Sequence, residues 1–143
     1  MNSVGSPESK DNDVVIATAE RSLRHITELL AKHRIGCVVI VEDEDKVCGI
    51  VSEHDVMRAV GKAGQQALGR PVSDFMTTAV VTANKTDKNQ RLLAEMATHQ
   101  FRHMPVVEKG KLVGIVSIGD LVRKYLEDAE ADSDALRDHI RSA

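Results

Sequence analysis

The sequence predicts an α/β protein made of two tandem βαββα units with pseudo-two-fold symmetry, in which small mixed sheets pack with helices. The run Gly-Ile-Val-Ser at 49–52 recurs at 114–117, and in both places an aspartate follows the serine by three residues. Short β-branched runs and segments of helical periodicity also alternate in the same order in both halves. One three-stranded unit with two helices cannot cover both faces of its sheet, so we expect the two copies to pack together.

The first copy is expected over residues 13–61, with strands at 14–17, 37–41 and 47–51 and helices at 22–33 and 53–60. The second copy is expected over 79–126, with strands at 79–82, 104–107 and 112–116 and helices at 88–99 and 118–126. Glycine and proline in residues 62–78 indicate a linker. Residues 1–12 are expected to be poorly ordered, and residues 127–143 to form an acidic helix or tail.

The composition excludes several classes of protein. With 42% hydrophobic and 29% charged residues the chain is in the globular range. The net charge of −3 and the lack of a basic run with aromatics argue against nucleic-acid binding. No apolar run approaches the ~20 residues that cross a membrane, and the first residues are polar and acidic, unlike a secretory signal, so we expect a cytoplasmic protein. Cys37 and Cys48 lie in apolar runs and predict reduced core thiols without sequence support for a redox role.

The repeated strand-to-helix corners carry the polar chemistry, and two interpretations are open for them. Ser-x-x-Asp before an apolar helix is a capping box, which needs no ligand. Alternatively, the helix N-terminus binds a phosphate with Ser52 or Ser117 as an extra donor. Asp55 or Asp120 would then accept hydrogen bonds from the hydroxyls of a ribose. The recurrence of the pattern favours this ribose-phosphate site.

These residues resemble the CBS-domain pair, also called the Bateman module. The likeness lies in Phe101-Arg102-His103-Met104-Pro105-Val106-Val107 and the following run to Asp120, and in the looser run from Arg34 to Asp55. It covers nearly the whole chain. The resemblance implies a stand-alone regulatory sensor with clefts between the copies for an adenosine-containing ligand, with AMP preferred and ADP, ATP, NAD(H) or S-adenosylmethionine as alternatives. It also implies a homodimer, and no cofactor is required.

The same resemblance assigns roles to individual residues. Asp55 and Asp120 are expected to hold ribose, Ser52 and Ser117 to contact phosphate or ribose, and Arg102 and His103 to supply positive charge to the phosphate. Adenine is expected in an aliphatic slot beside Asp120, in keeping with an aromatic content of only 2%. The slot would comprise Val80, Val81, Thr82, Met104 and Pro105, and the remaining expected ligand contacts are His54, Ile118 and Gly119.

The two copies are not expected to bind equally well. Gly36 and Cys37 of the first copy occupy the places of Arg102 and His103 in the second. The first copy therefore lacks this cationic pair, and we expect the Asp120 cleft to bind better. His54 of the first copy stands where the second copy has Gly119, so phosphate affinity there could favour the first copy.

Other functions have less support in the sequence. A catalytic site needs a nucleophile with a base, or paired acids in a pocket, and no such set or phosphate-binding glycine loop is found, so an enzyme is not expected. The six histidines show no metal-ligand spacing with each other or with cysteine, so no metal is expected. The stronger alternative is a ligand-free interaction or dimerisation module that regulates a client enzyme or transporter.

Overall fold

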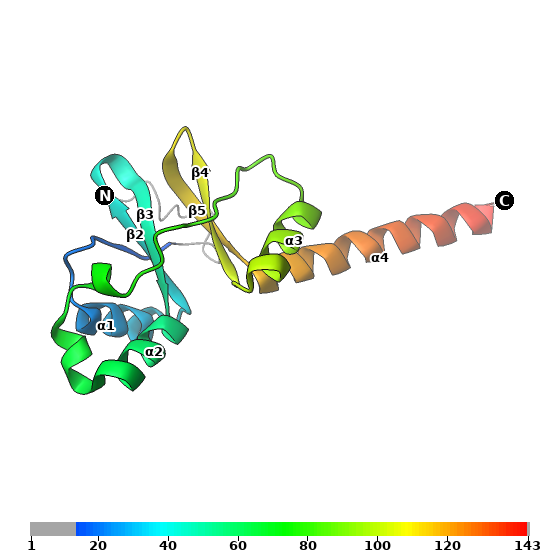
Figure 1. The fold of residues 1–143 in the computed structure, drawn as a ribbon. Coiled ribbons are helices and arrows are strands. Elements are labelled where there is room, and N and C mark those ends of the chain that lie inside the picture. The colour runs from blue at the N-terminus through cyan, green and yellow to red at the C-terminus, as the bar shows by residue number, and fades with distance from the viewer. Residues whose placement is uncertain (1–13, 143) are drawn as a thin grey trace.

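The computed structural model describes the backbone of residues 14–142 and the side chains of residues 14–130, so the expectation for residues 1–12 lies outside it. The described strands form one five-stranded sheet in the order β1-β2-β3-β5-β4. The first copy contains β1 (Ile16–Ala17), α1 (Leu23–His33), β2 (Cys37–Glu42), β3 (Lys46–Ser52) and α2 (Glu53–Ala63). The second contains α3 (Asn89–His99), β4 (His103–Glu108), β5 (Lys111–Ser117) and α4 (Ile118–Ser142). The predicted α/β class is confirmed, and Figure 1 shows the two similar halves.

The two antiparallel hairpins, β2–β3 and β4–β5, repeat each other in detail. Each contains a register shift at the same place, between Ile40 and Val41 in the first and between Val106 and Val107 in the second. The hairpins meet between β3 and β5 at a single pair, Lys46 with Lys111.

Apolar side chains of the described residues form a separate core in each copy and a third core between the copies. In the first copy, Leu23, Ile26 and Leu30 of α1 pack against Val38 and Ile40 of β2. The second copy has a smaller cluster that joins α3, β4 and α4 through Leu92, Met96, Met104 and Leu121.

The third core explains why the chain needs both copies. Val39 and Val41 alternate along β2 with the residues that face the helices, so they point to the opposite face of the sheet. There they pack with Leu112 of β5, which belongs to the second copy. Strand β2 is therefore buried on both faces, and neither copy has a complete interior by itself.

The predicted strand at 79–82 is wrong. The structure has only an isolated parallel bridge between Ala83 and Val106 in this region. The equivalent strand β1 pairs with β2, beside a hydrogen bond in which Val39 N–H donates to the Val15 carbonyl over 3.1 Å. In the second copy Pro105 stands in the position of Val39 and has no N–H to donate, which shortens the ladder.

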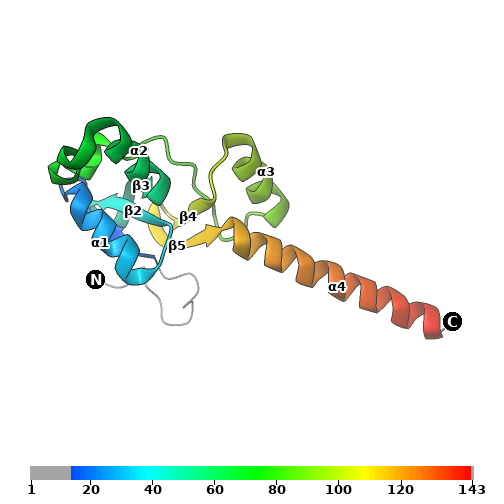
Figure 2. The same cartoon turned by 90° about the horizontal axis from the view of Figure 1, so that it is seen from below.

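The linker is more structured than a simple turn, and the last helix is longer than predicted. After α2, two short 3-10 helices follow, η3 (Gly64–Gly69) and η4 (Val72–Asp74); a third, η2 (Asp43–Asp45), forms the turn of the first hairpin. Helix α4 runs without a break from Ile118 to Ser142, through the boundary expected after residue 126. In Figures 1 and 2 it extends well beyond the remainder of the molecule.

Candidate functional site

Both repeated corners are capping boxes. In the first copy, the Ser52 N–H donates to Asp55 Oδ2 over 2.8 Å and the Asp55 N–H donates to Ser52 Oγ over 3.1 Å. The second copy repeats this pair with Ser117 and Asp120 at 3.2 and 3.1 Å. The capping interpretation is therefore correct for each corner, and the ligand interpretation depends on what lies in front of the carboxylates.

A cavity of about 230 Å³ lies beside the second corner. The first copy supplies Val14, Val15 and residues 34–37 to its wall, and the second copy supplies His103, Ile115, Ser117 and Asp120. The cavity is thus a crevice between the copies, as predicted. Its apolar walls are aliphatic, which also agrees with the expectation from the low aromatic content.

The apolar wall comes from a different segment than the one we predicted. The described lining beside Asp120 contains Val14 and Val15, and Val80, Val81 and Thr82 are not part of it. The reason lies in how the copies face each other. The residue before β2 meets the start of β4 so closely that a Cβ on Gly36 would lie 3.1 Å from His103 Cε1. Since His103 pairs with Ser117 across β4 and β5, this contact brings the first copy's strands in front of the second copy's corner.

Two other residues of the predicted adenine slot are also absent from the described lining of this cavity. Met104 is completely buried in the core of the second copy, and Pro105 is also fully buried. Both lie within β4, and their predicted role assumed that this strand exposes them to the cleft. Only His103, at the beginning of the strand, reaches the cavity.

The cations near the cavity also differ in part from the prediction. Arg102 is not among the described lining residues, and its carbonyl accepts a 2.8 Å hydrogen bond from the Ile118 N–H at the start of α4. Arg34 takes its place. It directly follows α1 as the C-cap of the helix, in a left-handed conformation with φ 53°, and it lines the cavity beside His103. No local sequence pattern indicates this role, because Arg34 reaches the cavity from the other copy.

His103 has charged neighbours from both copies. Burial lowers the pKa of its imidazole below the usual 6.5, and Arg102 acts in the same direction. The carboxylates of Asp120 in the second copy and Glu53 in the first oppose this effect by favouring the imidazolium. An anion in the cavity would add to the effect of these carboxylates.

The other expected ligand residues lie outside this cavity. Ser52 and Asp55 occupy the equivalent corner in the first copy, and His54 is exposed in the first turn of α2. Ile118 and Gly119, in the first turn of α4, are also absent from the described lining. The structure therefore brings three predicted residues together: His103, Ser117 and Asp120.

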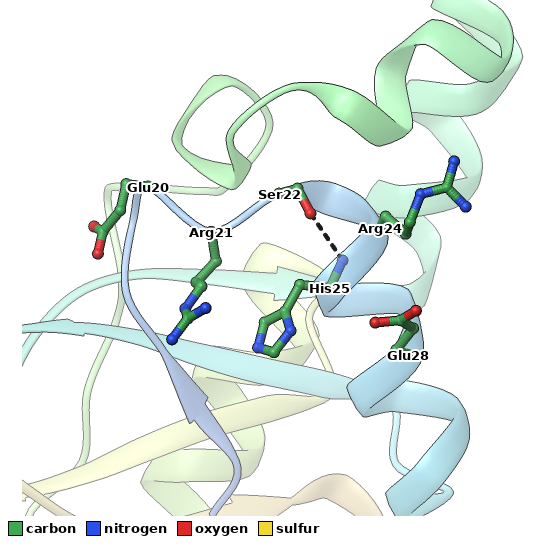
Figure 3. Close-up of a pocket in the computed structure, with 6 residues that line it drawn as sticks. All are labelled: Glu20, Arg21, Ser22, Arg24, His25 and Glu28. Carbon is green, nitrogen blue, oxygen red and sulfur yellow. Dashed lines mark hydrogen bonds between the residues drawn. The ribbon is translucent and has the colours of Figure 1, made fainter.

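A larger hollow of about 530 Å³ lies at the start of α1, away from these corners. Figure 3 shows its lining, which is polar or charged throughout: Glu20, Arg21, Ser22, Arg24, His25 and Glu28. Ser22 accepts the 3.1 Å hydrogen bond from the His25 N–H that caps the helix. Because every lining side chain is polar or charged, this hollow offers a base less apolar surface than the smaller cavity does, so we take the smaller cavity as the candidate site.

No group of three or more metal-binding side chains occurs within the part of the chain for which side chains are described. His99 instead stacks on Phe101, with 5.7 Å between ring centroids, and lies 3.3 Å from Glu95. In the same part of the chain, no helix has the length and apolar character needed to span a membrane.

The comparison with known families agrees with this geometry. The pattern of the CBS domain matches residues 10–62 and 72–127, that is, both copies. The chain belongs to the CBS-domain family. Among solved structures, a CBS-domain containing protein from Agrobacterium tumefaciens is 37% identical, with a TM-score of 0.75; the match covers 81% of this chain and 87% of the other.

Two further relatives match most of the chain. A CBS domain protein from Pyrobaculum aerophilum, solved in complex with AMP, is 31% identical with a TM-score of 0.69, and the match covers 75% of this chain and 82% of that one. An uncharacterised 17.7 kDa protein from Acidianus ambivalens is 32% identical over 116 residues, or 80% of this chain. This chain spans only 65% of the length of that curated relative.

Proposed function

We propose that this CBS-domain pair is a regulatory sensor that binds an adenosine nucleotide, preferentially AMP, in the cleft at Asp120. The observation that carries the proposal is a cavity that joins a carboxylate and a hydroxyl at a helix N-terminus to aliphatic walls from the other copy. Asp120 would hold the ribose, and Val14, Val15 and Ile115 would enclose the base. The AMP complex of the Pyrobaculum protein supports the ligand class.

The phosphate would lie near Ser117, His103 and Arg34. Ser117 precedes the first turn of α4, where free N–H groups and the helix dipole favour an anion. Arg34 adds a permanent positive charge from the first copy. The volume of 230 Å³ is below the roughly 300–1,000 Å³ of typical ligand sites, so we favour a mononucleotide over NAD(H).

Binding at this seam supplies a mechanism for regulation. The ligand would touch both copies, so it stabilises the relative arrangement in which Arg34 and Asp120 lie on the same cavity. A change in that arrangement is a signal only if a partner distinguishes the two states. We therefore propose a client protein, an enzyme or a transporter, as the receiver of the signal, and assign no catalysis to this chain.

Calorimetry with AMP tests the proposal. Asp120→Asn keeps an oxygen that accepts the capping N–H of Ser117 but removes the charge, and we expect it to weaken AMP binding by about 10- to 150-fold, the scale of hydrogen bonds to charged groups. Asp55→Asn is the matched control at the other corner and is expected to have the smaller effect. If the native chain binds none of AMP, ATP, NADH and S-adenosylmethionine, the ligand-free interaction module is the better description.

We also propose that the chain forms a homodimer through α2 and α4. The large exposed apolar side chains among the described residues are Met57 and Val60 on α2 and Ile118, Val122, Tyr125 and Leu126 on α4. The two helices are equivalent in the repeat, and Met57 corresponds to Val122. A second copy of the chain would cover both faces through one two-fold axis.

Light scattering after gel filtration tests the dimer. The native chain should elute with twice its mass of 15.6 kDa, and Val122→Asp with a single mass, because the charge would be buried in the interface. Lys124→Asp, a charge change on the same helix outside the exposed apolar set, should remain dimeric. A native chain that stays monomeric at high concentration contradicts the proposal.

A further inference from the structure

The carboxylate of Asp120 is held by a different partner on each of its oxygens. Oδ2 accepts the capping hydrogen bond from the Ser117 N–H at 3.2 Å, and Oδ1 accepts one from Arg123 Nη2 at 2.9 Å. A carboxylate has about four acceptor positions, so one position on each oxygen remains free. Two neighbouring ribose hydroxyls can each donate a hydrogen bond to one of these two free positions.

Arg123 acts from outside the cavity. Its side chain is 60% exposed and is not among the described residues that line the cavity, whereas Asp120 is. The guanidinium therefore fixes the carboxylate without occupying the space in front of it. It lies one turn along α4 from Asp120, at a spacing where side chains of a helix meet.

The first copy lacks an equivalent hydrogen bond. Arg58 stands three residues after Asp55, as Arg123 does after Asp120, but its Nη1 lies 3.8 Å from Asp55 Oδ1. That distance is too long for a hydrogen bond. The two corners share the capping box and differ in this contact.

We propose that Arg123 is a positioning residue, which orients the Asp120 carboxylate for the two ribose hydroxyls and so makes this corner the better ribose site. This inference rests on the proposed nucleotide function. The advantage is preorganisation, because the ligand does not have to order a carboxylate that is already held on both oxygens. An exposed ion pair contributes little by itself, so the expected effect on affinity is about two- to fivefold.

The test compares AMP with 2′-deoxy-AMP on each variant. If Arg123 positions the carboxylate, Arg123→Gln should weaken AMP binding about two- to fivefold and weaken 2′-deoxy-AMP binding less, so that discrimination between the ligands falls. Arg123→Lys, which restores the charge, should recover part of the discrimination. Lys124→Gln removes an equal charge from the neighbouring position, and Arg58→Gln removes the counterpart in the first copy; both should leave discrimination unchanged.

The outcomes separate this inference from the proposed function. If Arg123→Gln weakens both ligands equally, Arg123 acts only by attracting the phosphate, and the positioning role is wrong while the nucleotide site stands. An unchanged affinity for AMP overturns the positioning role in the same way. If the native chain binds neither ligand, the nucleotide function fails and the positioning role fails with it. Thermal melting of each variant confirms that the fold is retained.

Discussion

His103 is the side chain at which the two copies and the cavity meet. It touches the Gly36 position of the first copy, lines the cavity, and experiences the charges of Asp120 and Glu53 from opposite copies. Since burial holds the pKa of its imidazole below 6.5, folding favours the neutral form. Above about pH 6.5 the imidazole is neutral in both the folded and the unfolded chain, so its burial costs no stability. As the pH falls from there through the lowered pKa, the unfolded chain binds the proton more readily and the folded state loses stability.

This position makes His103 a reporter of an anion in the cavity. We expect the imidazole to titrate below 6.5 in the free chain and at a higher pH in the presence of saturating AMP, because a phosphate stabilises the imidazolium. Nuclear magnetic resonance of the imidazole protons measures both pKa values directly. An imidazole pKa that AMP leaves unchanged would place the phosphate elsewhere.

The two cysteines differ in environment. Burial, with a smaller contribution from Asp55, raises the pKa of Cys37 to about 12, and Cys48 is less buried, with a pKa that is also raised. Both are free thiols.

We expect a maleimide near neutral pH to label Cys48 first and Cys37 only slowly, because the thiolate is the reactive form. Mass spectrometry of a time course measures this order, and Cys48→Ser should leave only the slow reaction. Rapid labelling of Cys37 would show that the cleft opens.

The sequence predicted some of the individual residues of the candidate site and missed others. Ser117 and Asp120 could be predicted because the Ser-x-x-Asp motif of a capping box occurs twice in the sequence, once in each copy. Arg34 could not be assigned to the same cavity, because it approaches from the other copy and no local pattern records that contact. The absence of Arg102 from the described cavity lining could not be predicted for the same reason, because it depends on how the two copies pack.

Among the elements, the two equivalent helices α1 and α3 begin differently. Ser22 caps α1 through a 3.1 Å hydrogen bond from the His25 N–H, whereas the residue in that place before α3, Lys88, makes no side-chain cap. We expect Ser22→Ala to lower the free energy of unfolding by about 1 kcal/mol, and Lys88→Ser to raise it by a similar amount. Urea denaturation of both variants measures the changes. If both substitutions changed the free energy of unfolding equally and in the same direction, the difference between the two helix caps would not be supported.

The strands show where prediction by periodicity fails. The residues at 14–17 and 79–82 look alike as short β-branched runs, and only the first became part of a strand, β1. The difference lies in the partner strand, where Pro105 replaces Val39 and removes the hydrogen-bond donor. Helices and hairpins were predicted well because their patterns are local, and the edge of a sheet depends on a distant residue.

For the molecule as a whole, the linker makes the two copies unequal. Residues before the second copy pass over the first, where Thr77 forms an antiparallel bridge with Ile50 and Met76 covers Gly49. A Cβ on Gly49 would lie 2.5 Å from Met76 Sδ, whereas a Cβ on Gly114, the equivalent residue, meets no described atom within 4 Å.

These glycines form a matched pair for a test of that arrangement. We expect Gly49→Ala to destabilise the fold by about 1 kcal/mol, because the half-buried side chain of Met76 must shift away from the new methyl group. Gly114→Ala should change stability by no more than about 0.5 kcal/mol. Thermal denaturation of the two variants compares them directly, and equal losses of stability would show that the linker does not cover the first copy in this way.

A crystal structure of the chain grown with AMP would show whether the crevice between the copies, at Asp120, receives an adenosine nucleotide. We expect the ribose hydroxyls to lie within hydrogen-bond distance of the Asp120 carboxylate, and the adenine to lie between Ile115 and the pair Val14 and Val15. AMP bound at the polar hollow before α1, or an empty crevice at saturating AMP, would show that the proposed site is wrong.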